Sequence, residues 1–236
     1  FRQNNLEFGG PSGSTVEFFL SKSDIPGGGT VSTAQSPRQV IFDLWNGVST
    51  GSVDDDETNG CYGNLRIELS KSLEDRFLVT MLSGTKGYVT QSIPTTGGVG
   101  KYITGSGFNG VCLETGIAPD GHQAGQISLV TGSLIGNIGA LRVAPSGVSD
   151  ANSMEGRGKL SGSIDEFRFW KTARTGEDIG RNWFTHVNGG TNTEDANVGL
   201  GVYYKFNEGV FGTSSVDNVV LDYSGRLSNG LFTGYD

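Results

Sequence analysis

Two adjacent acids, Asp165 and Glu166, come closest to the chemistry of a glycosidase. A retaining glycosidase needs two carboxyl groups about 5–5.5 Å apart across the bond that it cleaves. The run 159–170 has a strand pattern, and neighbouring side chains on a strand point to opposite faces. The two acids therefore cannot form such a pair without a β-bulge, and the chain has no Glu-x-Asp-x-x-Glu run. We expect no catalytic residues and no enzyme activity. We expect Asp165 to bond a neighbouring loop and Glu166 to face Arg168 or a nearby turn.

The chain offers few side chains for a metal or for nucleophilic catalysis. His122 and His186 are the only histidines, and neither lies in a nucleophile motif or in a zinc-type cluster. The densest acidic run, 54–57, lacks the alternating ligands and the central glycine of an EF-hand loop. We interpret this run as a solvated hairpin tip. Two cysteines, Cys61 and Cys112, are too few for a disulfide framework, and both a single bridge and two separate thiols stay open.

Aromatic side chains are the candidates for a sugar-binding surface, because flat rings stack on the apolar faces of sugars. Trp45, Trp170 and Trp183 lie in strong strand or helix patterns, so we expect them to pack in the core. Tyr102 and Phe108 lie in a Gly- and Thr-rich stretch, 95–126, where a binding loop fits best. We take these two as the candidate ligand-binding residues, with simple packing as the alternative.

Composition limits the fold and the partners. The chain has 236 residues, 39 of them glycine, and a net charge of −8. So many glycines disfavour a helix bundle. A pI near 4.8 disfavours nucleic acid, whose phosphates attract Lys and Arg. No apolar run approaches the ~20 residues of a membrane helix, so we expect no membrane insertion.

The elements that must position these residues are mainly strands. Period-2 alternation and apolar runs, separated by Gly-, Pro- and Asn-rich turns, predict an all-β antiparallel sandwich in a single domain, 1–236. We expect this domain to be a module of a longer chain. One helix is predicted at about 176–186, with Thr175 as its N-cap, Asp178 in the capping-box position, and a Gly-rich stop at 188–190. The predicted strands are 15–20, 40–45, 65–69, 77–82, 135–143, 159–170 and 202–206.

Three groups of segments in the chain resemble a known family. The run Gly162-Ser-Ile-Asp-Glu-Phe-Arg-Phe-Trp170, with the helix start that follows it, looks like the closing signature of LamG-like domains. These domains belong to the concanavalin A-like lectin/glucanase superfamily. The segments 203–209, 222–225 and 229–230 resemble the family's later motifs, and 5–8 with 15–19 resemble its opening strands. The resemblance implies a two-sheet jelly roll with one short helix.

The sequences of two further segments, 40–47 and 180–184, resemble LamG-like modules in structural proteins of tailed marine phages. This resemblance implies a virion surface or extracellular location, with other virion or surface-protein subunits and glycans as partners. Family positions near a structural cation make Asp222 and Asp165 the candidate metal residues and calcium the candidate cofactor. Asp222 would act directly, or by holding the loop at 223–225.

The chain departs from the family in its middle, where we find neither a Trp-His-His strand nor a Tyr-Val-Asp-Gly hairpin. Those strands contribute to the ligand-binding face of lectin members, so sugar binding does not transfer directly. The leading hypothesis is a non-catalytic structural or display module that adheres to surface glycans. The alternatives are a carbohydrate-binding module that accompanies an enzyme, and a glycoside hydrolase.

Overall fold

The computed structural model describes residues 5–6, 14–22, 39–45, 63–69, 76–83, 88–94, 134–142, 158–182, 184–185, 187, 199–208 and 218–232. Side chains at 22, 63, 76, 81–83 and 88–94 are outside this description.

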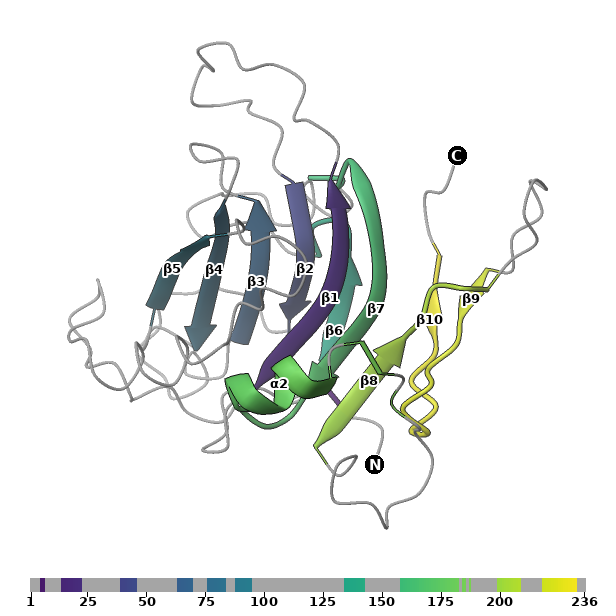
Figure 1. Cartoon of the computed structure of the whole chain (residues 1–236). Helices are drawn as coiled ribbons and strands as arrows, with labels where there is room; N and C mark the ends of the chain where they lie inside the picture. The colour runs from purple at the N-terminus through teal and green to yellow at the C-terminus, as the bar shows by residue number, and fades with distance from the viewer. Residues whose placement is uncertain are drawn as a thin grey trace, which may run out of the picture.

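Antiparallel sheets make up nearly all of the described secondary structure (Figure 1). The largest sheet has five strands, in the order β5 (Tyr88–Pro94), β4 (Arg76–Ser83), β3 (Gly63–Leu69), β2 (Gln39–Trp45) and β6 (Ile135–Ile138). A second sheet has three, in the order β1 (Thr15–Lys22), β7 (Gly162–Trp170) and β8 (Leu200–Tyr204). A two-stranded ladder pairs β9 (Val219–Val220) with β10 (Gly230–Leu231), and α2 (Gly176–Asn182) is the helix.

The main core lies between the five-stranded and the three-stranded sheets. The Phe42 ring on β2 lies 5.0 Å from that of Phe167 and 6.1 Å from that of Phe169, both on β7. Alternation supplies the other members, because every second residue of β3 and β4 faces the same side. The buried core residues are Ile41, Phe42, Leu44, Leu65, Ile67, Leu69, Phe77, Val79, Phe167, Phe169 and Val202. The predicted all-β antiparallel sandwich with a helix is therefore confirmed at this level, and the jelly-roll topology stays a prediction.

Strand β7 contains a bulge at Glu166. The register between β1 and β7 shifts there, and Glu166 has a φ of 52°, in the left-handed region. Ile164 and Phe167 both pack against the core, so the two acids between them lie on the side away from it. The expectation that Asp165 and Glu166 point to opposite faces is therefore wrong, because the bulge interrupts the alternation.

The helix begins as predicted and ends earlier. The Thr175 hydroxyl accepts a hydrogen bond from the Asp178 N–H at 3.1 Å and donates one to the Asp178 carboxylate at 2.6 Å. The helix ends at Asn182, whereas the sequence predicted an end near 186. Both the N–H and the hydroxyl of Thr185 donate to the Asn182 carbonyl, and this turn replaces further helical hydrogen bonds.

Candidate functional site

A row of hydrogen-bonding side chains crosses the five-stranded sheet on its outer face, the face away from the core. Register places Thr80 of β4, Arg66 of β3, Asp43 of β2 and Asn137 of β6 side by side. Their neighbours along each strand, including Phe42, face the core, so these four face outward. We call these four residues the polar row.

Asp43 organises the polar row. Its Oδ1 accepts hydrogen bonds from Asn64 Nδ2 at 2.9 Å and from Arg66 Nε at 3.0 Å. Its Oδ2 accepts from Arg66 Nη2 at 3.3 Å and from the Arg142 backbone N–H at 2.7 Å. Asp43 has no exposed surface, and Arg66 is only 4% exposed, so this ion pair lies in a low-dielectric environment. The pair therefore fixes two neighbouring strands and the segment that carries Arg142.

The polar row ends beside an aromatic side chain at the β6 edge. Trp45 pairs directly with Ile135 of β6, and the two side chains share the outer face. Trp45 is half-buried, Ile135 is 37% exposed, and the Arg142 guanidinium carbon lies 5.8 Å from the Trp45 ring centroid. The prediction that Trp45 packs in the core is therefore wrong. We call Trp45, Ile135 and Arg142 the Trp45 edge.

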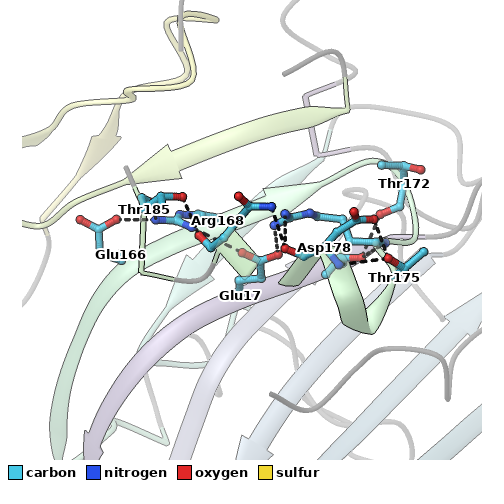
Figure 2. Close-up of polar contacts among 10 residues, drawn as sticks. Glu17, Glu166, Arg168, Thr172, Thr175, Asp178 and Thr185 are labelled. Carbon is cyan, nitrogen blue, oxygen red and sulfur yellow. Dashed lines mark hydrogen bonds and ion pairs between the residues drawn. The ribbon is translucent and has the colours of Figure 1, made fainter. Parts of the chain in front are cut away.

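The outer face of the three-stranded sheet carries a second polar group, called here the Arg168 cluster: Glu17, Glu166, Arg168, Arg174 and Tyr203. Figure 2 shows three of its members, Glu17, Glu166 and Arg168. Arg168 Nη2 donates to Glu166 Oε2 at 2.9 Å and to the Thr185 carbonyl at 2.7 Å. Its Nη1 lies 3.6 Å from Glu17 Oε2. Arg168 is 2% exposed, so its charge is compensated inside the protein. Glu166 faces Arg168, as predicted.

The Arg168 cluster shifts the pKa of two of its members. Burial alone would lower the pKa of Arg168, but hydrogen bonds to Glu166 and Tyr203 raise it overall. Burial, and then a hydrogen bond to Glu166, raises the pKa of the Tyr203 phenol to about 12. The cluster thus holds a protonated tyrosine and a charged arginine around one carboxylate.

Arg174 connects the Arg168 cluster to the start of α2. It forms an ion pair with Glu17, and its guanidinium carbon lies 4.3 Å from the Trp170 ring centroid. The Thr15 hydroxyl donates to the Thr172 carbonyl at 2.9 Å and accepts from the Arg174 backbone N–H at 2.9 Å. These contacts fasten the connection between β7 and α2 to β1. Trp170 is buried, as predicted.

Asp222 holds the turn that follows it. Its Oδ1 accepts the N–H groups of Tyr203 at 3.0 Å and Ser224 at 2.9 Å. Its Oδ2 accepts the Ser224 hydroxyl at 2.8 Å and the Ser228 N–H at 2.9 Å. Four protein donors therefore occupy this carboxylate, which fits the expected role of holding the loop and does not fit direct calcium ligation.

The other predicted metal residue, Asp165, is exposed, and its Oδ1 accepts the Glu166 N–H at 2.9 Å. This bond is to its own neighbour, whereas the sequence predicted a bond to another loop. Within the described ranges, no group of three or more His, Cys, Asp or Glu side chains is placed to hold a metal ion. Calcium stays a prediction, and melting with and without excess chelator would test it, because a bound ion raises stability.

Several predicted residues lie outside the described ones, namely Tyr102, Phe108, Cys61, Cys112, His122, His186, Trp183 and the acidic run 54–57.

The sequence analysis missed the Trp45 edge. Strict alternation from Phe42 and Leu44 would have placed Trp45 outside the core, but the nearly continuous apolar run concealed that pattern. In the part of the chain that the structure describes, no helix is long and apolar enough to cross a membrane.

Comparison with known proteins gives little further information. No family model matches the chain, and no curated protein matches it. One solved structure that it resembles is a candidate carbohydrate-binding protein from Bacteroides ovatus, at 17% sequence identity and a TM-score of 0.29. The match covers 91% of this chain and 57% of that one. A TM-score this low carries no argument about fold or function.

Proposed function

We propose that this chain is a non-catalytic β-sandwich module that binds glycans at the Trp45 edge. One observation carries the proposal: a half-buried indole on the outer face, with a guanidinium 5.8 Å from its ring centroid. Aromatic rings stack on the apolar faces of sugars, and Arg donors hydrogen-bond to hydroxyl or acidic groups. The Asp43 carboxylate fixes the Arg142 backbone, so the site is pre-organised.

The use of the buried carboxylates supports a non-catalytic role. Asp43 and Asp222 each accept four hydrogen bonds from the protein. Glu166 is bound to Arg168 and Tyr203. A glycosidase needs one carboxylic acid that donates a proton and one carboxylate that acts on the sugar or water. These three acids serve the fold instead.

The resemblance to LamG-like phage modules extends the proposal to location. We place the module on a virion surface or another extracellular assembly, beside other virion or surface-protein subunits. A net charge of −8 suits a displayed domain, because it maintains solubility. The alternative, a carbohydrate-binding module that accompanies an enzyme, uses the same site and differs only in its neighbour along the parent chain.

A glycan array with the multimerised domain tests the binding proposal, because multivalency makes weak single-site binding measurable. We expect Trp45→Ala to weaken binding about tenfold, and Trp45→Phe to weaken it less. Phe184→Ala is the matched control, because Phe184 is an aromatic residue that is 64% exposed elsewhere. Equal binding by Trp45→Ala and the unaltered chain would overturn the proposed site.

Two further measurements separate the alternatives. Mass spectrometry of purified particles tests the virion location, and absence of the chain from particles would reject it. Assays on common β-glucans test catalysis. Turnover that disappears in Asp165→Asn or Glu166→Gln would replace the binding module with a glycoside hydrolase.

A further inference from the structure

Cations and aromatic rings alternate along the outer face of the three-stranded sheet and reach its β8 edge. The guanidinium carbon of Arg168 lies 4.9 Å from the Tyr203 ring centroid, and Lys205 Nζ lies 5.4 Å from the same centroid. Lys205 Nζ is 4.5 Å from the Tyr223 centroid, and the two tyrosine rings meet edge to face at 6.3 Å. Tyr203 has no exposed surface, whereas Tyr223 and Lys205 are half-buried, so the series ends at the protein surface.

Polar groups of several kinds surround this exposed end. The Tyr223 hydroxyl donates to Asn207 Oδ1 at 3.4 Å, and Asn207 is exposed. Glu208 lies close enough that its negative charge, after the effect of burial, helps to raise the pKa of Tyr223. Glu208 Oε1 accepts the Leu221 N–H at 3.2 Å. Its Oε2 is shielded from solvent and has no hydrogen-bond donor among the described residues.

The backbone beneath these groups is fixed. The Tyr223 N–H donates to the Tyr203 carbonyl at 2.8 Å, and the preceding Asp222 is held by its four donors. Phe206, between Lys205 and Asn207, has a φ of 53°, a conformation that a non-glycine residue adopts at some cost in energy. The structure therefore keeps a strained backbone next to a set of exposed polar groups, a combination frequent at binding sites.

We infer that Lys205, Asn207, Glu208 and Tyr223 form a second binding site, for an uncharged saccharide. Its chemistry matches hydroxyl groups, which both donate and accept: Lys205 donates, Glu208 accepts, and the Asn207 amide does both. The Tyr223 ring offers an apolar surface for a sugar face. Lys205 repels a cationic ligand and Glu208 repels an anionic one, so a neutral ligand fits best.

This site is distinct from the Trp45 edge. The main core separates the two sheets, so their outer faces point away from each other. A chain with both sites bridges two saccharides, or two parts of one surface. The inference does not depend on the proposed function, because the two sites share no residue.

Titration of the ¹⁵N-labelled chain with uncharged hexasaccharides of glucose, xylose and mannose tests this inference. We expect the backbone amide signals of Asn207 and Tyr223 to shift with at least one of them, and trigalacturonate, an acidic probe, to bind more weakly. Tyr223→Ala should weaken the interaction about tenfold, and Asn207→Ala about threefold. Phe184→Ala is the control for the loss of an exposed aromatic residue. Tyr223→Phe keeps the ring packing, so a smaller loss in that variant shows that the effect is not unfolding.

No shift at Asn207 or Tyr223 with any uncharged probe would overturn the inference, and so would tighter binding of trigalacturonate. The same titration of Trp45→Ala separates the two proposals. Shifts that persist at Asn207 and Tyr223 in that variant show a second site, whatever becomes of the Trp45 edge. Shifts that vanish there show one site only, and the inference fails.

Discussion

The outer faces of the two sheets both bury charged side chains, but they compensate the charge differently. On the five-stranded sheet a single acid, Asp43, accepts four hydrogen bonds from Asn64, Arg66 and the Arg142 backbone. On the three-stranded sheet Arg168 shares two carboxylates, Glu17 and Glu166, with other partners. Arg174 also contacts Glu17, and Tyr203 also contacts Glu166.

This difference predicts how much stability a single substitution removes from each outer face. Removal of Asp43 takes an acceptor from several buried donors at once, and each buried group that is left unsatisfied costs about 1–3 kcal/mol. Removal of one member of a shared network leaves the others with part of their contacts. The polar row should therefore be more sensitive to a single substitution than the Arg168 cluster.

Asp43→Ala gives the largest expected effect. It removes the carboxylate that lies 3.0 Å from the buried Arg66 guanidinium, so we expect a loss of about 3–5 kcal/mol in the free energy of unfolding. Asp43→Asn keeps one acceptor oxygen and should lose less. Urea denaturation of the unaltered protein, Asp43→Ala and Asp43→Asn measures the loss of stability in each variant. A loss below about 1 kcal/mol for Asp43→Ala would mean that Arg66 finds other compensation, and the proposed contrast would fail.

Arg168→Met should have a smaller effect, about 2–3 kcal/mol, although Arg168 is as deeply buried as Arg66. Glu17 keeps Arg174 and Glu166 keeps Tyr203, so neither carboxylate loses every partner. The same urea series gives the value, with Arg181→Met as the control because Arg181 is largely exposed. A loss greater than that of Asp43→Ala would contradict the distributed role of the cluster.

High pH tests the Arg168 cluster through Tyr203. Its pKa in the folded protein is about 12, above the ordinary value of 10.0. A raised pKa means that the folded state holds the proton more tightly, so this contribution is complete below pH 10 and disappears as the pH rises toward 12. We expect Tyr203 to contribute about 2 kcal/mol to the resulting fall in stability. The melting temperature of Tyr203→Phe should fall less steeply between pH 10 and 12 than that of the unaltered protein. Parallel pH profiles would show that Tyr203 does not titrate in this way.

Much of the fold could be predicted from local patterns. Alternation and apolar runs located most of the strands, because a half-buried strand places every second side chain in the core, but they did not locate β5, β9 or β10. The capping box located the first residue of the helix, because Thr175 satisfies an N–H group that the helix leaves free. The end of the helix was less predictable, since it depends on the Thr185 contacts with Asn182.

The candidate sites were harder to predict because they depend on register and on long-range contacts. Asp43 and Arg142 are 99 positions apart, and nothing in either segment indicates that they meet. The bulge at Glu166 also has no local signal, because its left-handed φ falls on a residue type that usually avoids that region. The contact of Asp222 with the turn that follows it has a local signal, because Asp side chains often accept the N–H group two residues further on, as Asp222 accepts that of Ser224.

The smallest effect that we predict concerns the start of α2, next to the Arg168 cluster, where the exposed Thr175 caps the helix. Thr175→Ala removes the acceptor of the Asp178 N–H, and loss of an N-cap costs about 1 kcal/mol. The hydrogen bond from Thr175 also lowers the pKa of Asp178, so NMR titration of Thr175→Ala should show that pKa rising toward its ordinary value. A lowered pKa stabilises the folded protein above that range and loses the effect as the pH falls through the native pKa, so the variant should be less sensitive to acid. Thr175→Ser keeps the hydroxyl and should retain both properties. An unchanged Asp178 pKa in Thr175→Ala would show that Arg174 and Arg181, rather than the cap, set it, and electrostatics would then dominate even at this exposed edge.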